Sequence, residues 1–457
     1  MLPISYNIKR YPDVTDVERR DASAETLLRR EKPDRIHAKI RHVCATRVLH
    51  MLTRREWFTS LPVWGTAVAG AAAKTKTAAK IKVGSLETFV VHVNARGNWV
   101  FVRLGSSVGL TGIGEASQSG NDRLTLQYLQ QFADLLEGRS VFDIEWLREQ
   151  VRPEIKLLDG LLLRGGRSAA CALSALEQCC WDIIGQALNV PVYDLFGGAL
   201  RTSIRLYANI NRSTDPRTPA GFASMAERAL EAGFDAVKLA PWDEMPRGLY
   251  SGPKAEEITQ QGIDRAEATR KAIGPKRDLL LDAHSKFDVE HGLRLLPRVA
   301  PLNLFWIEEV TRPPGLPAIR RYAELAKYMP IAGGESRYGA KAFYPYMTAG
   351  SVDILMPDVK YCGGMLEVKK VGILGASAGL KVAPHDPAGP VGTAATAQVC
   401  ATMQDFLILE FAFGEVPWRA ELIDPPEDTT HGRLAVTSRP GLGIRLNEKT
   451  AARYRAP

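Results

Sequence analysis

Cysteine is scarce in this sequence, and the patterns that mark several common protein classes are missing. The 457 residues include six cysteines, and no two of them form a C-x-x-C pair. This argues against a disulfide framework and against structural zinc, so we expect small, buried cysteine side chains. Apolar residues make up 45% of the chain and charged residues 24%. That composition is typical of globular proteins and excludes a mostly disordered chain, a collagen-like chain and a multi-span membrane protein.

An excess of positive charge is missing from most of the chain. The net charge is +8 at pH 7, but residues 1–50 hold 11 basic and 7 acidic residues, a net +4, and residues 51–82 contribute +5. Residues 83–457 therefore carry a net charge of −1. Because a nucleic-acid-binding surface needs clustered positive charge on the folded body, we expect no nucleic-acid partner.

Residues 51–80 are typical of an export signal and the junction after it. The pair Arg54-Arg55 precedes Phe58, and a short, weakly apolar stretch ends in alanines at 71–73. This order resembles a twin-arginine signal peptide, although an arginine pair can also precede an apolar helix by chance. The apolar stretch is too short to span a membrane. We therefore expect a periplasmic protein with no stable membrane association after cleavage, and a cytoplasmic protein is the alternative.

Signal peptides stand at the N-terminus of a precursor, whereas residues 1–50 are charged and aperiodic. We expect translation to begin at Met51, with residues 1–50 a mis-annotated or disordered extension. N-terminal sequencing of the precursor should begin at Met51, and peptides from residues 1–50 in a cell lysate would contradict this. A reporter fusion found wholly in the cytoplasm would overturn the expected export.

Two domains are expected after residue 80. Residues 81–125 alternate as in an antiparallel meander, and residues 123–150 and 167–190 carry helical periodicity. Strands followed by helices predict an α+β capping domain over residues 81–200. Residues 413–457 are expected to return and pack on that domain.

From residue 201 the pattern changes to short apolar runs, each followed by a helical stretch. Eight such units fill residues 201–412, which predicts an α/β fold of the (β/α)8 TIM-barrel type. A doubly wound open sheet is the alternative, but no G-x-G-x-x-G turn opens the pattern. The predicted strands are 204–210, 236–240, 279–284, 304–309, 330–335, 352–358, 380–385 and 407–412.

Three carboxylates stand at the ends of successive predicted strands. Asp282, Glu308 and Glu335 are 26 and 27 residues apart, which is one barrel unit each. One carboxylate there would most simply cap a helix, but three adjacent ones repel each other unless a cation lies between them. Oxygen ligands suit Mg²⁺, so we predict a magnesium site at this end of the barrel.

The next two strands end in Asp358 and His385, which could form a pair in which the aspartate orients a basic imidazole. His385 could also be a core or capping histidine. His284 follows Asp282 by two residues, so strand periodicity points it into the same site, either for proton transfer or as a further metal ligand. Lys238 could clamp a substrate carboxylate or carry a proton, and Glu410 could accept a hydrogen bond from a substrate hydroxyl. Ion pairs at the barrel mouth are an equally good interpretation of these two.

These parts predict a reaction class. A divalent cation on a substrate carboxylate stabilises the enediolate that forms when an α-proton leaves. A histidine base and a second acid nearby allow a β-hydroxyl to leave as water. The predicted partner is therefore a small hydroxylated carboxylic acid.

The same residues resemble a known family over nearly all of 81–457, namely the mandelate racemase subgroup of the enolase superfamily, which uses Lys or His bases with Mg²⁺. The resemblance implies that Asp282, Glu308 and Glu335 bind Mg²⁺, that Asp358 and His385 form the Asp/His dyad, and that Glu410 is the glutamate of the eighth strand. It also implies a homo-oligomer, either a dimer or an octamer. The matching motifs are GIGEAS (112–117), 175–198, LLLDAH, WIEE (306–309), GGE (333–335), MPDVKYCGG (356–364), VAPHDPAGP (382–390) and PGLGIRL (440–446).

Two positions in these motifs indicate which reaction of the family is expected. The family often has K-x-K on the second strand, but here Ala240 replaces the second lysine, so a two-base racemase is not favoured. Asp282-x-His284 is similar to the D-x-H of galactonate and mannonate dehydratases, which implies that His385 takes the α-proton and His284 protonates the departing hydroxyl. The loops at 109–121 and 242–257 are expected to select the substrate.

The leading hypothesis is a Mg²⁺-dependent acid-sugar dehydratase, a hydro-lyase that produces a 2-keto-3-deoxy acid. An epimerase or cycloisomerase could use the same enediolate. A non-catalytic sugar-acid binding protein is the alternative from a different class.

Overall fold

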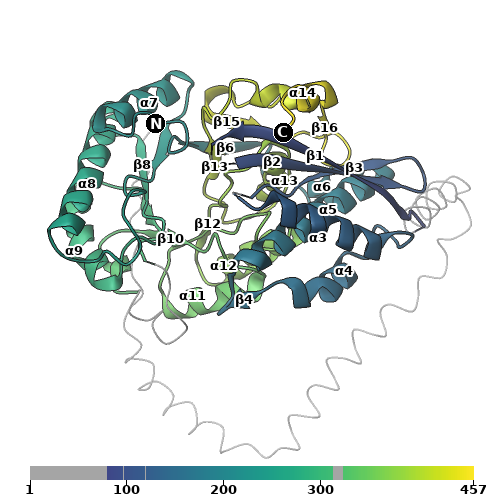
Figure 1. Cartoon of the computed structure of the whole chain (residues 1–457), viewed down its shortest axis with the longest axis horizontal. Coiled ribbons are helices and arrows are strands. Elements are labelled where there is room, and N and C mark those ends of the chain that lie inside the picture. Colours follow the sequence, from purple (N-terminus) through teal and green to yellow (C-terminus); the bar gives the residue numbers. More distant parts are fainter. Residues whose placement is uncertain (1–79, 96, 119, 312–322) are drawn as a thin grey trace, which may run out of the picture. The chain divides into compact units, whose positions relative to one another are not determined.

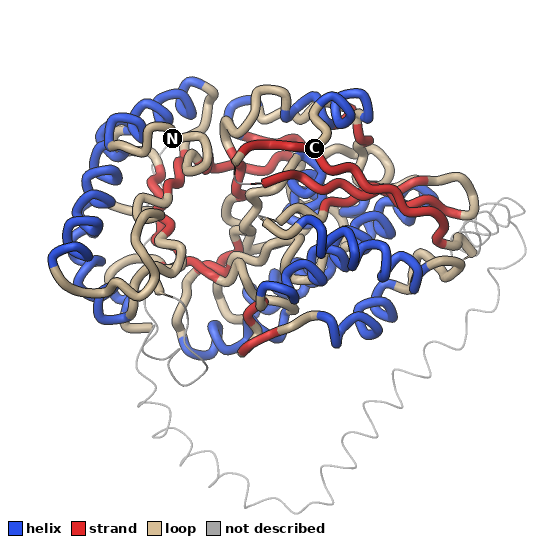
Figure 2. Tube along the Cα trace, viewed as in Figure 1, coloured by secondary structure: helices blue, strands red, loops and turns tan. Residues whose placement is uncertain are grey.

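The capping domain begins with a three-stranded antiparallel sheet, as predicted. In this computed structural model the described residues are 80–95, 97–118, 120–311 and 323–457, so the predicted extension and nearly all of the predicted export signal lie outside them. The first three strands pair in the order β1-β2-β3, and Figure 2 shows the long strands β1 and β2 side by side. They are β1 (Val83–Asn94), β2 (Gly97–Ser106) and β3 (Thr111–Glu115).

Helices follow this sheet, but the helical stretch predicted at 123–150 is two helices. The first ends before Gly138, whose φ of +71° is compatible with glycine and not with a continuing helix. A hairpin that the pattern did not predict, β4 (Leu157–Leu158) and β5 (Leu161–Leu162), comes next. The helices of the capping domain are α3 (Asp122–Leu136), α4 (Ile144–Val151), α5 (Arg164–Leu188) and α6 (Val192–Leu195).

Helix α5 lies directly on β3, and this contact explains two glycines of the GIGEAS motif. A Cβ at Gly112 would lie 2.1 Å from the carbonyl oxygen of Cys179, and one at Gly114 would lie 2.2 Å from that of Ala175. A larger residue at either position would push the helix off the sheet. The cysteines of this helix are buried and unbridged, as expected for small apolar side chains.

The eight predicted strands after residue 201 form one parallel sheet in the predicted order. The chain β6 through β12 pairs sequentially, β13 pairs with β6, and a bridge between Val382 and Phe406 connects β12 to the segment before β13. This closes the predicted barrel. The strands are β6 (Ser203–Asn209), β7 (Ala236–Leu239), β8 (Asp278–Asp282), β9 (Trp306–Glu308), β10 (Ile331–Gly333), β11 (Ile354–Leu355), β12 (Lys381–Val382) and β13 (Leu409–Ala412).

Helices cover the outside of the barrel, and Figure 1 shows three of them, α7 to α9, along one side. The eighth strand departs from the predicted pattern because a 3-10 helix, η8 (Arg419–Leu422), follows it. Among the described residues, no helix is long and apolar enough to cross a membrane. The α-helices after residue 201 are α7 (Pro219–Glu231), α8 (Pro253–Ile273), α9 (Val289–Val299), α11 (Tyr344–Ala349), α12 (Met365–Ser377), α13 (Pro390–Cys400) and α14 (Glu448–Arg453).

The C-terminal segment runs back to the capping domain. Its strand β15 (Arg433–Ala435) pairs with β6, and β14 (Ile423–Asp424) pairs with β16 (Arg445–Leu446). Beyond them, the amide of Ala456 donates to Val90 on β1. Helix α14 contacts β1 (Figure 1).

Two buried glutamates of the capping domain bind the N-termini of barrel helices. Glu115 accepts hydrogen bonds from the amides of Gly389 and Gly392 at 2.7 Å each, where α13 begins. Glu177 on α5 accepts from the first two amides of α12, at 2.9 and 3.0 Å. Carboxylates are stabilised there by free amides and by the helix dipole. These contacts fix the two loops that precede α12 and α13, and those loops carry Asp358 and His385.

Replacing Glu115 by glutamine tests this connection. The side-chain NH₂ group of the variant would face one of the two glycine amides, which leaves a buried donor unpaired. We expect the free energy of unfolding in urea to fall by about 1–3 kcal/mol. Glu87→Gln is the control, because its carboxylate is 52% exposed and its ion pair with Arg103 should contribute less than about 1 kcal/mol. Equal stability of both variants would contradict the proposed role of Glu115.

Candidate active site

The three carboxylates predicted to bind metal lie together at the carboxyl ends of their strands. Asp282 and Glu308 are the last residues of β8 and β9, and Glu335 follows β10 by two residues. One oxygen from each lies within 4.8 Å of the others. Glu335 Oε2 is buried and accepts no aligned hydrogen bond within the described part of the chain, although His385 Nε2 lies 3.1 Å away.

Electrostatics in this cluster favour a bound cation. Burial and the neighbouring Asp282 carboxylate raise the pKa of Glu308 to about 8, although the Lys238 ammonium acts in the opposite direction. Three carboxylates this close repel one another, and a further positive charge between them would relieve that repulsion. Their all-oxygen donor set and their spacing fit a hard divalent cation with open positions for substrate.

Lys238 lies beneath the cluster and is 1% exposed. Its Nζ is 3.0 Å from both Glu308 Oε2 and Glu410 Oε1, and 3.7 Å from Asp282. Burial opposes its charge, but the carboxylates of Glu308 and Glu410 hold its pKa well above the usual value. This geometry matches the ion-pair interpretation of Lys238.

Glu410 is held on both oxygens. Asn209 Nδ2 donates to Oε1 at 2.6 Å, and the amide of Asp386 donates to Oε2 at 3.0 Å. Burial would raise its pKa, but Lys238 and His385 lower it below the usual value, so the group is ionised. Asn209 is the last residue of β6, and the strand-end argument that identified the other site residues could have found it.

The structure places Asp358 and His385 in contact. His385 Nδ1 lies 2.8 Å from Asp358 Oδ2. The amide of Lys360 donates to Asp358 Oδ1 at 2.7 Å, and the Lys360 ammonium lies 3.1 Å from Asp358 Oδ2. Burial lowers the pKa of His385, but Glu335, Glu410 and Asp358 together raise it to about 9. With Nδ1 held by Asp358, Nε2 is the nitrogen that faces the Glu335 carboxylate, 3.1 Å away.

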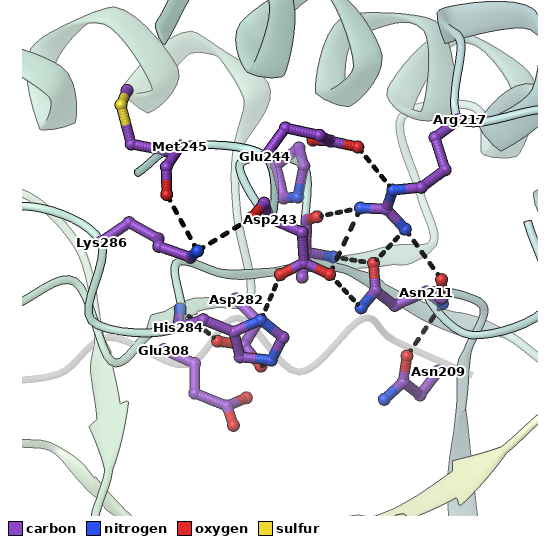
Figure 3. Close-up of polar contacts among 12 residues, drawn as sticks. Asn209, Asn211, Arg217, Asp243, Glu244, Met245, Asp282, His284, Lys286 and Glu308 are labelled. Atoms are coloured by element: carbon purple, nitrogen blue, oxygen red, sulfur yellow. Dashed lines mark hydrogen bonds and ion pairs between the residues drawn. The ribbon is translucent and has the colours of Figure 1, made fainter. Parts of the chain in front are cut away.

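His284 reaches the same cavity by a route that strand periodicity did not predict. Strand β8 ends at Asp282, and His284 lies beyond it in a turn with a φ of +46°. The premise that His284 continues the strand is therefore wrong, although its side chain does line the pocket. Its Nε2 is 3.0 Å from Asp282 Oδ2, and its Nδ1 hydrogen-bonds to Asp243 (Figure 3).

The sequence patterns did not predict several residues that line this pocket or contact its lining. Asp243 lies in the 242–257 loop, which was expected only to select substrate. Arg167 comes from α5 of the capping domain, and its position could not be read from the barrel pattern. One cavity of about 200 Å³ contains the site. Its lining is Arg167, Asn209, Asn211, Arg212, Asp282, His284, Glu335, Tyr361, His385, Pro387 and Glu410.

Mg²⁺ should raise the thermal stability of the metal-free protein, because a ligand that binds only the folded state stabilises it by about 2.7 kcal/mol at 100 times its Kd. In a thermal-shift titration, Glu335→Gln should need at least about tenfold more Mg²⁺ for the same shift. Glu267→Gln, on the exposed face of α8, is the control and should match the wild type. A wild-type protein that shows no shift with Mg²⁺ would contradict the site.

Comparison with known proteins identifies the family. Residues 79–197 match the mandelate racemase / muconate lactonizing enzyme N-terminal domain, and residues 221–450 match the enolase C-terminal domain-like family. A D-gluconate/D-galactonate dehydratase of Picrophilus torridus is 31% identical over 354 residues, which cover 77% of this chain and 86% of that protein. A D-galactarolactone cycloisomerase of Agrobacterium fabrum is 31% identical over 296 residues, 63% of this chain and 74% of that protein.

A solved structure supports the same conclusion. The mandelate racemase/muconate lactonizing enzyme-like protein from Rubrobacter xylanophilus is 30% identical and superposes with a TM-score of 0.73. The match covers 82% of this chain and 98% of that one. The chain belongs to the mandelate racemase subgroup of the enolase superfamily.

Proposed function

We propose that this protein is a Mg²⁺-dependent dehydratase that converts a sugar acid into a 2-keto-3-deoxy acid. The observation that carries the proposal is the pair of histidines, His284 and His385, that line one cavity with two of the three clustered carboxylates. Each histidine has an aspartate on Nδ1. The relative from Picrophilus torridus, named as a gluconate/galactonate dehydratase, supports a sugar acid as the substrate class.

Asp282, Glu308 and Glu335 would hold the cation. When bound there, Mg²⁺ supplies the positive charge that stabilises the developing negative charge of the substrate carboxylate. Lys238 then serves as the internal counter-ion of Glu308 and Glu410, and does not clamp the substrate.

His385 acts as the base in this proposal. A cation held by Glu335 would offset the carboxylate charge that raises the pKa of this imidazole, so that its neutral form could accept a proton. Its Nε2 takes the proton from the carbon next to the carboxylate, while Asp358 holds Nδ1 and stabilises the imidazolium. The electron pair of the broken C–H bond then forms the double bond to the β-carbon. As the β-hydroxyl leaves, His284 gives it a proton and water departs. The resulting enol takes a proton at the β-carbon and becomes the 2-keto-3-deoxy acid.

A cycloisomerase is the second candidate, because the Agrobacterium fabrum relative carries that name. Ala240 disfavours a two-base epimerase, since the small side chain cannot serve as a base on the opposite face of the substrate. The paired histidines disfavour a non-catalytic binding protein.

We further propose that the protein works as a homo-oligomer in the periplasm, on small external sugar acids. The arginine pair at 54–55 supports export, and the absence of excess positive charge in residues 83–457 supports a small-molecule partner. The homo-oligomer rests on the resemblance to the family. A protein that cell fractionation finds only in the cytoplasm would overturn this location.

Purified protein should dehydrate at least one acid in a panel of mono- and dicarboxylic sugar acids with Mg²⁺, and EDTA should abolish the reaction. The keto product is measured by carbonyl derivatisation. His385→Asn should lower turnover by roughly 10²- to 10⁴-fold, because it removes the base, while substrate binding measured by calorimetry stays near the wild-type value. His92→Asn, on the exposed side of β1, is the control. If turnover survives in His385→Asn, His385 is not the base.

A further inference from the structure

The imidazole of His284 is held from two sides. Its Nδ1 hydrogen-bonds to the Asp243 carboxylate, and its Nε2 lies 3.0 Å from Asp282 Oδ2. The amide of His284 also donates to Asp282 Oδ1 at 2.8 Å. His284 also has a left-handed backbone conformation, which is uncommon for a residue other than glycine. Such a conformation persists where the surroundings impose it. The contact with Asp243 joins two loops that are 41 residues apart.

The two oxygens of the Asp243 carboxylate bind different partners. Oδ1 faces the imidazole, while Oδ2 accepts a hydrogen bond from Asn211 Nδ2 at 2.9 Å and lies 3.4 Å from Arg217 Nη2. Arg217 also donates to the carbonyl oxygens of Asn211 and Ala240 at 2.9 Å each. The loops after β6 and β7 therefore hold the carboxylate in one orientation (Figure 3).

The main chain on both sides of the contact is fixed as well. Lys286, two residues after His284, donates to the carbonyl oxygens of Asp243 at 2.8 Å and Met245 at 2.9 Å. The turn that carries His284 and the loop that carries Asp243 are therefore connected twice, once by the His284 side chain and once by that of Lys286. Figure 3 shows both connections converging on Asp243.

We propose that Asp243 is the positioning residue of a second Asp–His pair, which orients His284 for proton donation to the leaving hydroxyl. Asp243 has no place among the residues that line the cavity, so it acts through His284 and not on the substrate. The two pairs give the site one imidazole for each proton: Asp358 orients the base and Asp243 orients the acid. This inference rests on the proposed dehydratase function.

Asp243→Asn tests the pairing directly. Because the Oδ2 position receives two donors, the amide oxygen of the variant must stay there, and its NH₂ group then faces His284 Nδ1. The variant can no longer accept a hydrogen bond from the imidazole. We expect product formation to fall by roughly ten- to hundredfold. In D₂O the variant should still place deuterium at the α-carbon of recovered substrate, because His385 is untouched.

Glu244→Gln is the matched control. Glu244 is the next residue in the same loop and pairs with Arg217 at 2.7 Å and Arg265 at 2.6 Å, with its carboxylate 43% exposed. The Glu244→Gln variant should keep both its product formation and its deuterium exchange at the substrate α-carbon within about twofold of the wild-type values. If Asp243→Asn does not fold, Asp243→Ser, which is too short to reach the imidazole, tests the same contact.

The outcomes separate this proposal from the proposed function. Equal loss of α-exchange and product formation in Asp243→Asn would show a general disturbance of the site and overturn the role of Asp243. If the wild-type protein dehydrates a sugar acid and Asp243→Asn forms the product at the same rate, the role of Asp243 is overturned as well. A wild-type protein that turns over no acid in the panel would instead overturn the dehydratase function on which this role depends.

Discussion

The balance of buried charge at the carboxyl ends of the barrel strands is the constraint on which the site depends. Four carboxylates, those of Asp282, Glu308, Glu335 and Glu410, gather there, and Lys238 beneath them supplies one positive charge. Burial and the Asp282 carboxylate raise the pKa of Glu308, and even with the His385 imidazole beside Glu335 the four carboxylates leave an excess of negative charge. A divalent cation removes it. Asn209 and the amide of Asp386 fix Glu410, and Glu410 pairs with Lys238. These contacts therefore also help to position the carboxylates that would bind a cation.

The capping domain contributes to the same site in a less direct way. Glu115 and Glu177 bind the first amides of α13 and α12, and each helix begins just after a loop that carries one member of the Asp358–His385 pair. The sheet and long helix of the cap thus fix the loops that hold Asp358 and His385, while α5 also places Arg167 in the cavity. This explains why the cap and the barrel form one site although their sequence patterns differ.

The fold class and the strand order could be predicted because barrel strands have a simple pattern: a short apolar run with a polar residue at its end. That pattern predicted six residues that the structure brings together at the carboxyl ends of the strands: Asp282, Glu308, Glu335, Asp358, His385 and Glu410. It failed for features set by contacts between loops. The contact of Asp243 with His284 joins residues 41 positions apart, and the turn at His284 ended β8 two residues early. Neither has a local pattern. The break between α3 and α4, by contrast, had a visible cause in Gly138.

The central claim is that one histidine removes the α-proton and that the β-hydroxyl departs in a later step. The most direct measurement is NMR of the reaction in D₂O with the wild-type protein, Mg²⁺ and a sugar acid that it turns over. The account predicts a 2-keto-3-deoxy product that carries one deuterium at C3, added when the enol is protonated. Epimerised substrate with deuterium at C2 and no keto acid would contradict it and would show proton transfer without elimination.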